Sequence, residues 1–249
     1  MFGPDDILQG KKSTVRVGIG SDASTGNVER SVTALGNPNV EVYHDPRKLV
    51  DDLLSGKIDA AIRGDMSSSS LLYLLKEKVG IDGLERLAIL ETKIGKRIFL
   101  APVGIDEGWT VDQKYEMARR SVKVIGEFGI NPRIAVMSGG RSDDMGRNAS
   151  VDRSIKDALE LVGRLNKDGY NAYHSEILIE SAVEEADLIV APDGVTGNLI
   201  FRIMHFIADA IAYGAPVVNI DKVFVDTSRV KTDYIDSILL AIRLVEGRR

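Results

Sequence analysis

The sequence predicts an α/β protein built on mostly parallel strands. Short runs rich in β-branched residues alternate with longer runs that carry apolar residues at helical spacing. Strand, helix and strand in repetition are typical of parallel pairing through right-handed crossovers. At 249 residues the chain is long for one domain, so we expect one large unit or two lobes that share a cleft.

Eight segments are predicted to be strands and five to be helices. The strands are short and rich in Val and Ile, and they span residues 14–20, 39–45, 58–64, 86–92, 97–104, 133–139, 187–193 and 215–221. The helices span residues 46–56, 67–80, 111–129, 150–169 and 198–214, and each ends in a glycine, a common stop signal. The polar stretch at residues 104–110 is the expected boundary between lobes.

Composition excludes several kinds of site and partner. The chain has no cysteine for disulfides, thiolate chemistry or metal binding, and its three histidines are widely spaced, so we expect no metal. A net charge of −5 without a long basic run argues against nucleic acid. No apolar run approaches the roughly 18 residues of a membrane span, and the first residues lack the apolar region of a secretion signal. We therefore expect a cytoplasmic protein with a small-molecule ligand.

Four polar loops follow predicted strands and are the places where a ligand is expected. In parallel sheets, ligands bind beyond the carboxyl ends of the strands, where loops lead into helices. Glycines in such loops let successive N–H groups point at an anion, and the dipole of the next helix adds a favourable potential. The four loops span residues 17–27, 61–70, 137–147 and 191–198.

The loop APDGVTGN places Asp193, Gly197 and Asn198 between a buried strand and a helix expected from about Asn198. Its glycines would let the loop hold a phosphate-sized group at the start of that helix. An ordinary helix start, with Thr196 or Asn198 as the cap, explains the same residues equally well.

The loop SGGRSDDMGR carries a more specific pattern. Ser138, Gly139 and Gly140 follow a strand, and Arg141 follows the glycines. A guanidinium group matches the oxygens of phosphate or carboxylate with two parallel hydrogen bonds. The alternative is a surface turn in which arginines pair with the two following aspartates. A ligand role is favoured here.

Two further stretches add candidate residues. Arg63 and Gly64 precede a run of serines at a helix start, where the serines can be caps and the arginine solvated. Ser228 and Arg229 precede a helix expected from about residue 232, with Asp233 in its first turn. A hydroxyl, a fixed cation and an acid suit group transfer, whereas an N-cap beside a dipole-favoured aspartate is the structural alternative.

Gly18, Gly20 and Ala23 fit a G-x-G-x-x-A nucleotide fingerprint, which would suggest a dinucleotide or S-adenosylmethionine site. That fingerprint requires the helix to start within the glycine turn. Four more polar or glycine residues follow before any apolar periodicity here, so this interpretation is disfavoured.

Together these loops resemble the phosphate acetyltransferase and butyryltransferase superfamily. The sequence pairs Pro192-Asp193, Gly197-Asn198 and Ser228-Arg229 match that superfamily's PD…GN loop and its later SR pair, in the same order. The similarity runs from about Ile58, where DAAIRG matches a superfamily segment, to the C-terminus. Within the superfamily, SGGRSDDMGR followed by SVDRS is most similar to the archaeal MtxX family, a methanogenesis marker named as a methyltransferase subunit.

The resemblance implies a two-lobed α/β/α fold with a cleft between the lobes, like that of phosphotransacetylases and of isocitrate and isopropylmalate dehydrogenases. It implies a first lobe of residues 1–105 plus 231–249, a second lobe of residues 106–230, and a homodimer. In the acyltransferases the Ser-Arg pair and a following acid act on coenzyme A thiol and acyl phosphate. The resemblance therefore implies Ser228 and Arg229 as catalytic residues, with Asp233, or Asp236 in another register, as the acid. The expected ligand-binding residues are Arg63, Gly64, Ser138, Gly139, Gly140, Arg141, Asp193, Gly197 and Asn198.

Three functions fit this sequence. The leading one is a transferase-like protein that binds a phosphorylated or acyl-phosphate ligand between its lobes, with coenzyme A as a possible cosubstrate. The second is a non-catalytic subunit of a methyl-transfer assembly. The third is an S-adenosylmethionine-dependent methyltransferase. Methyl transfer has little direct support in the residues, because the chain has no cysteine and no D-x-H-x-x-G corrinoid signature.

Overall fold

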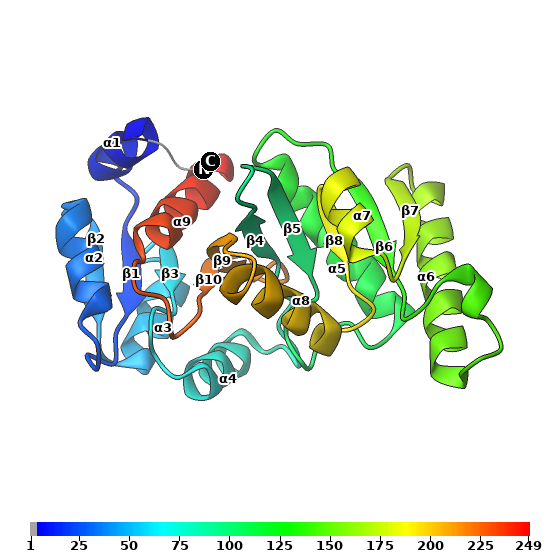
Figure 1. Ribbon diagram of the computed structural model, residues 1–249. Helices are drawn as coiled ribbons and strands as arrows, with labels where there is room; N and C mark the ends of the chain where they lie inside the picture. The colour runs from blue at the N-terminus through cyan, green and yellow to red at the C-terminus, as the bar shows by residue number, and fades with distance from the viewer. Residues whose placement is uncertain (1–3) are drawn as a thin grey trace. The chain divides into compact units, whose positions relative to one another are not determined.

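The computed structural model describes residues 4–249, which form two compact units. Unit 1 contains the chain up to Leu84 together with Tyr213–Arg249, and unit 2 contains Glu85–Ala212. Both units are α/β with mostly parallel strands, so the predicted fold class is confirmed (Figure 1). The lobe boundaries expected from the resemblance stay a prediction.

Unit 1 has four parallel strands in the order β2–β1–β3–β10, and β9 runs antiparallel to β10. The strands are β1 (Val17–Gly20), β2 (Val40–Tyr43), β3 (Ala60–Ile62) and β10 (Val223–Asp226), while β9 (Ile211–Pro216) contains the boundary between the units. The helices are α1 (Pro4–Lys12), α2 (Asn27–Leu35), α3 (Pro46–Leu54), α4 (Ser68–Val79) and α9 (Ile235–Gly247).

The last helix completes the core of unit 1. Helix α9 packs against β1, β3 and β10, and eight of its thirteen residues are buried, as expected for a helix that is apolar on most sides. The strand β10 pairs with β3 in parallel, so the segment that follows β10 lies at the same sheet edge as the loops after β1 and β3.

Unit 2 has its parallel strands in the order β5–β8–β6–β7, with β4 antiparallel to β5. The strands are β4 (Ala88–Glu91), β5 (Arg97–Ala101), β6 (Arg133–Met137), β7 (Asn171–Glu176) and β8 (Leu188–Val190). The helices are α5 (Val111–Gly126), α6 (Ala149–Lys167), α7 (Ile179–Glu185) and α8 (Gly194–Phe206), and a short 3₁₀ turn, η1 (Ser142–Asp144), lies before α6.

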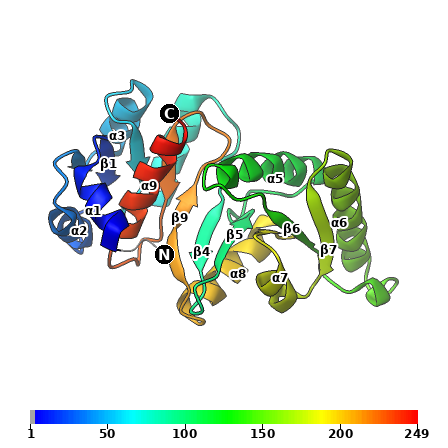
Figure 2. The ribbon, with the colours of Figure 1, turned by 90° about the horizontal axis from the view of Figure 1, so that it is seen from above.

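The helices of unit 2 cover both faces of its strands. Figure 2 shows α5 on one side of the strands and α7 and α8 on the other. Helix α6 packs against α5 and follows β6, whereas α8 follows β8. The loops after the neighbouring strands β8 and β6 therefore leave toward opposite faces. Such a switch point is where parallel α/β sheets form a crevice for a ligand.

The helix predicted at residues 198–214 is wrong at both ends. Helix α8 begins at Gly194 and ends at Phe206, and residues from Ile211 form β9. The non-glycine residue Asp209 adopts a left-handed φ of 55° in the connection, which breaks the helix before any glycine is reached. Accordingly, β9 begins four residues before the strand predicted at residues 215–221.

Candidate functional site

The loop after β6, at the switch point of unit 2, is held in a defined conformation. The hydroxyl of Ser138 donates to the carbonyl oxygen of Gly140 at 2.8 Å, and the Ser138 side chain is 1% exposed. The N–H of Gly139 donates to Ser154 Oγ on α6 at 2.6 Å. Gly139 is exposed, and a Cβ added to it would lie 3.4 Å from Ser154 Oγ, an ordinary contact distance.

Two side chains of β7 fix the ends of this loop. His174 Nε2 lies 2.8 Å from Ser138 Oγ, and because that hydroxyl donates to Gly140, the histidine is assigned as the donor. Glu176 accepts from the N–H and the hydroxyl of Ser142, at 2.9 and 2.7 Å. Glu176 itself has a left-handed φ of 57°, which is unusual for a non-glycine residue.

The electrostatics of the two β7 residues follow from these contacts. Burial lowers the pKa of His174, and the charge of Glu176 opposes that shift. The hydrogen bonds from Ser142, backbone first, lower the pKa of Glu176. We therefore infer a neutral His174 and an ionised Glu176 at neutral pH. Neither residue was singled out from the sequence, because nothing local marks a histidine or glutamate in a strand as a loop support.

Arg141 carries the guanidinium of this loop that is exposed and free to bind a ligand. Its N–H donates to Asp144 Oδ2 at 2.9 Å, whereas its exposed guanidinium has no hydrogen bond or ion pair with any residue in the range 4–249. The ion pair expected for the turn forms between Arg147 and Asp144 instead. The loop thus contains one paired and one unpaired arginine.

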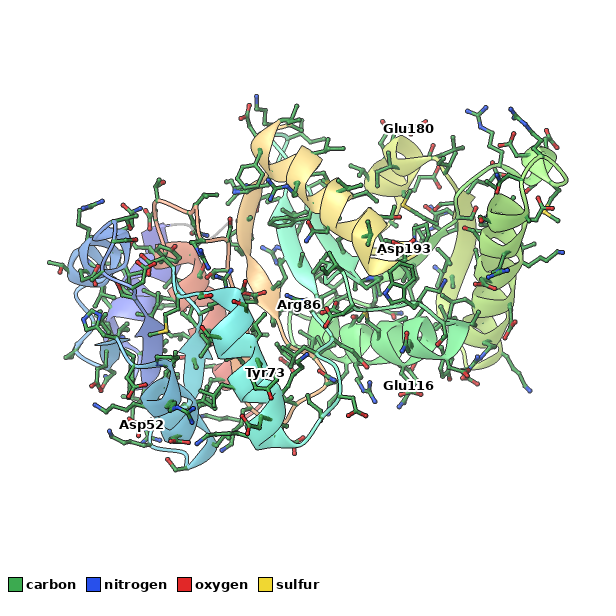
Figure 3. All side chains as sticks on the ribbon, turned by 90° about the horizontal axis from the view of Figure 1, so that it is seen from below. Asp52, Tyr73, Arg86, Glu116, Glu180 and Asp193 are labelled. Carbon is green, nitrogen blue, oxygen red and sulfur yellow. The ribbon has the colours of Figure 1, made fainter. Side chains whose placement is uncertain are left out.

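The loop after β8 is mostly the first turns of a helix. Asp193, and not Thr196 or Asn198, is the N-cap of α8, and its Oδ1 accepts from the N–H of Thr196 at 2.8 Å (Figure 3). The N–H of Gly194 donates to the carbonyl oxygen of Glu107 at 3.0 Å. The expected helix start near Asn198 is therefore corrected by four residues, because Asp193 supplies the cap, three residues before Thr196 and five before Asn198.

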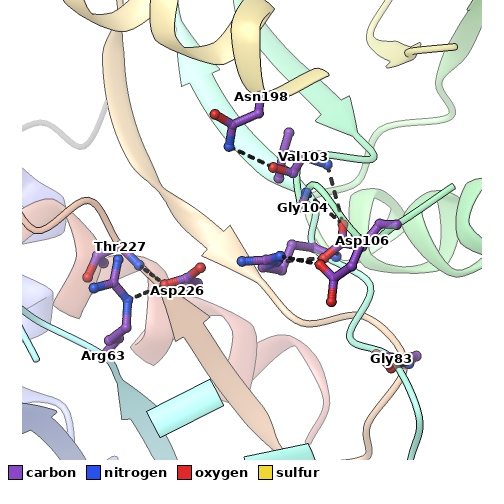
Figure 4. A network of polar contacts seen from close by, with 11 residues as sticks. Arg63, Gly83, Val103, Gly104, Asp106, Asn198, Asp226 and Thr227 are labelled. Carbon is purple, nitrogen blue, oxygen red and sulfur yellow. Dashed lines mark hydrogen bonds and ion pairs between the residues drawn. The ribbon is translucent and has the colours of Figure 1, made fainter. Parts of the chain in front are cut away.

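The two glycines of this turn are required for packing. A Cβ on Gly194 would lie 1.6 Å from the carbonyl oxygen of Gly104, and one on Gly197 would lie 1.9 Å from that of Pro102. Asn198 donates to the carbonyl oxygen of Val103 at 2.9 Å (Figure 4). These contacts lock α8 onto the loop after β5. Ligand contacts by Asp193, Gly197 and Asn198 stay a prediction.

A buried lysine lies at the same edge of the strands. Lys114, in the first turn of α5, is 5% exposed, and its Nζ donates to the carbonyl oxygen of Pro192 at 3.0 Å. Burial lowers its pKa, and the charges of Asp157 and Asp193 oppose that shift. The sequence offered one signal that could have pointed to it, namely a lysine on the apolar stripe of a helix.

In unit 1, Arg63 and Gly64 are built into the end of β3. Arg63 is 6% exposed, and its Nε is paired with Asp226 (Figure 4). Its Nη1 donates to the carbonyl oxygen of Met66 at 2.8 Å. A Cβ on Gly64 would lie 1.8 Å from the carbonyl oxygen of Gly20, and its φ is 63°. These contacts are structural, and a ligand role for the two residues stays a prediction.

The stretch after β10 carries the three predicted catalytic residues. Ser228 is half-buried, and its carbonyl oxygen accepts from the Tyr234 hydroxyl at 3.4 Å. Arg229 is exposed and has no hydrogen bond with the described part of the chain; after hydrogen bonds from Ser24, its charge helps to lower the pKa of Asp22. Asp233 accepts from the N–H of Ile235 at 2.8 Å, just before α9.

The predicted site residues thus fall into two sets. Unit 1 brings together the ends of β3 and β10, with Arg63, Gly64, Ser228, Arg229 and Asp233. Unit 2 brings together the ends of β6 and β8, with the remaining seven. Helix α2 begins at Asn27, seven residues after β1 ends, so the glycines of the nucleotide fingerprint do not open a helix. Among residues 4–249, no helix is both long and apolar enough to cross a membrane.

Comparisons with known proteins show the family of this chain. The sequence profile described as "Phosphate acetyl/butaryl transferase" matches residues 48–242. "Putative methyltransferase mtx subunit X" of Methanosarcina mazei is 46% identical over 80% of this chain and 72% of its own length, and the Methanosarcina barkeri protein of the same name is 43% identical over 94% and 84%.

Solved structures show the same fold at low sequence identity. A branched-chain phosphotransacylase from Enterococcus faecalis gives a TM-score of 0.70 at 16% identity, covering 94% of this chain and 99% of that one. A phosphotransacetylase from Streptococcus pyogenes gives 0.68 at 16% identity, covering 99% of each chain. The chain therefore belongs to the phosphate acetyl/butaryl transferase family and, within it, to the mtx subunit X proteins.

Proposed function

We propose that this protein is a transferase of the phosphotransacetylase type that binds a phosphate or acyl-phosphate ligand. The observation that carries the proposal is the loop after β6, where exposed Gly139 and the unpaired guanidinium of Arg141 lie beside a switch point. A guanidinium that is not engaged within the protein can donate two parallel hydrogen bonds to a phosphate. The supports from β7 hold the loop in one conformation, which lowers the entropy cost of binding.

Group transfer requires more than binding, and the stretch after β10 supplies suitable side chains. Arg229 is an exposed cation without a hydrogen bond or ion pair in the described part of the chain, and it can stabilise negative charge developing on a transferred group. Ser228 contributes a hydroxyl beside it, and Asp233 contributes a carboxylate. Whether both sets of residues serve one ligand stays a prediction.

Ligand-induced melting tests the proposal. Binding to the folded state alone at about 100 times the dissociation constant adds about 2.7 kcal/mol of stability, which raises the melting temperature by roughly 5 °C or more. We expect such a rise with acetyl phosphate or phosphate, and a separate response to coenzyme A. No response to any of the three would contradict the transferase proposal.

Arg229 variants test the transfer step. Arg229→Ala is expected to lose about 2 to 4 kcal/mol of transition-state stabilisation with little change in melting temperature, and Arg229→Lys is expected to be impaired because lysine lacks the fork. A lowered melting temperature with unchanged ligand binding would instead assign Arg229 to the scaffold.

The names of the relatives support a second candidate. They are named as methyltransferase subunits, so a non-catalytic role in a methyl-transfer assembly is the alternative. It predicts ligand binding without turnover.

A rise in melting temperature with S-adenosylmethionine alone would favour the third candidate, an S-adenosylmethionine-dependent methyltransferase. The surroundings of Gly18 argue against this methyltransferase. A Cβ on Gly18 would lie 2.6 to 2.9 Å from the core side chains of Ile58, Leu49 and Tyr43, so this glycine is required for packing.

Helix α8 offers a surface for the predicted homodimer. Its solvent-facing side carries five exposed apolar residues: Val195, Leu199, Ile203, Phe206 and Ile207. A stripe of this kind commonly marks a protein interface, and a two-fold contact would pack it against its own copy. Sedimentation of the wild type and of Leu199→Arg tests this: we expect a dimer that the substitution weakens, and a monomeric wild type would contradict it.

A further inference from the structure

Glu176 has one carboxylate oxygen that the support of the loop after β6 does not use. Both hydrogen bonds from Ser142 go to Oε1, at 2.9 and 2.7 Å. Oε2 accepts no hydrogen bond from any residue in the range 4–249, and the side chain is half-buried. An ionised carboxylate can only accept hydrogen bonds, so Oε2 can bind a ligand only through a proton that the ligand supplies.

Glu176 follows an irregularity in its strand. Consecutive residues of β6, Val136 and Met137, pair with residues of β7 that are two apart, so Ser175 is an extra residue in β7. A bulge of this kind re-aims the neighbouring side chain and is frequent next to functional sites. Glu176 also has a left-handed φ of 57°, which is costly for a non-glycine residue. Strained residues cluster at ligand sites, so this carboxylate is a candidate for ligand contact.

The carboxylate faces the free guanidinium of the loop. After the hydrogen bonds from Ser142, the charges of His174 and Arg141 lower the pKa of Glu176, while burial opposes them. Arg141 is therefore near the carboxylate, although no ion pair joins the two in the described part of the chain. The neighbouring carboxylate of Asp144 uses both oxygens, because Oδ2 accepts from the N–H of Arg141 and Oδ1 is in an ion pair. Glu176 thus keeps a free acceptor beside Arg141, whereas Asp144 does not.

We propose that Glu176 makes the anion site of the loop after β6 selective for an oxyanion that carries a proton, such as inorganic phosphate, over a fully ionised one, such as sulfate. The inference rests on the proposed function and deepens it. Arg141 donates to two oxygens of the ligand, and a protonated oxygen donates to Glu176 Oε2. Phosphate keeps at least one proton near neutral pH, whereas sulfate keeps none. Sulfate therefore meets the carboxylate with like charge and without a donor, which disfavours its binding.

The test is titration calorimetry with inorganic phosphate and with sulfate, at neutral pH and constant ionic strength, on the wild type, Glu176→Gln and Asp143→Asn. Asp143 is an exposed carboxylate of the same loop, so both substitutions remove one negative charge. One charge-assisted hydrogen bond predicts that the wild type prefers phosphate about 10- to 100-fold. Glu176→Gln should reduce this preference to less than about threefold, because an amide can donate to sulfate. Asp143→Asn should change both affinities equally and keep the preference.

Ser142→Ala separates ligand selection from support of the loop. It removes the hydrogen bond from the hydroxyl to Oε1 but leaves the carboxylate, so the preference for phosphate should stay. If Glu176 only supports the loop, Glu176→Gln should weaken both anions to the same degree, and that result would overturn the inference while leaving the proposed function intact. Equal affinity of the wild type for phosphate and sulfate would do the same. No phosphate binding by the wild type would overturn the proposed function, and the inference with it.

Discussion

The loops after β6 and β8 lie at the same edge of the sheet and contain similar glycine motifs, but their glycines have different roles. In the loop after β8, Gly194 and Gly197 touch backbone carbonyl oxygens so closely that no side chain fits. In the loop after β6, Gly140 is buried against the side chain of Val151, whereas Gly139 is exposed and has room for a Cβ. A glycine motif after a strand therefore indicates either close packing or ligand access, and the space around the missing Cβ distinguishes them.

The charged side chains of the two loops also differ. The N-terminus of α8 is capped by its own Asp193, whose carboxylate would repel a second anion. The loop after β6 contains Arg141, whose guanidinium has no hydrogen bond or ion pair with residues 4–249. On this comparison, the loop after β8 is a scaffold and the loop after β6 is the binding element.

The largest expected effect on stability comes from adding a side chain at a closely packed glycine. Gly197→Ala forces the Pro102 carbonyl or α8 to move and should lower the free energy of unfolding by about 3 kcal/mol, the upper part of the range for overpacking. Gly139→Ala is the matched control, and it should cost less than about 1 kcal/mol, because its Cβ meets only a side-chain hydroxyl at contact distance. Urea unfolding of both variants measures the difference, and equal losses would contradict the comparison.

Removing the hydrogen bond between His174 and Ser138 should have an intermediate effect on stability. His174→Ala removes the hydrogen bond to Ser138 and should cost about 1 kcal/mol at pH 7. The folded pKa of His174 lies below its unfolded value, so the protonated form is disfavoured in the folded protein. Wild-type stability should therefore fall as the pH drops from about 6.5 through the lowered pKa, and this dependence should be missing in His174→Ala. The same pH slope in both proteins would assign it to other groups.

Glu176 should give the smallest effect on stability, one that is present at neutral pH and disappears in acid. Its folded pKa is lowered by the bonds from Ser142, so its contribution is present at neutral pH and is lost as the pH falls through that lowered pKa. Melting curves of the wild type and Glu176→Gln should differ at neutral pH and converge below about pH 4. A difference that persists in acid would show that the carboxylate charge is not the cause.

The sequence predicts the fold class and most strands well, because β-branched runs and glycine stops are local signals. The start of α8 was misplaced because Gly194 and Gly197 look like loop residues until their neighbours at residues 102–104 are known. The contacts of His174, Glu176 and Lys114 depend on how β7, α5 and β8 meet. No local pattern encodes that arrangement, so the contacts of the three residues appear only in the structure, although the place of Lys114 on the apolar stripe of α5 is a local hint of its burial.

The central claim is that the loop after β6 binds the anion, and calorimetry with phosphate on Arg141→Ala and Arg147→Ala tests it most directly. Both substitutions remove one arginine from the same loop, but only Arg147 is already paired with Asp144. We expect Arg141→Ala to weaken phosphate binding about 10- to 100-fold, as for loss of a charge-assisted hydrogen bond, and Arg147→Ala to change it by less than about threefold. Phosphate binding by Arg141→Ala with wild-type affinity would contradict the claim.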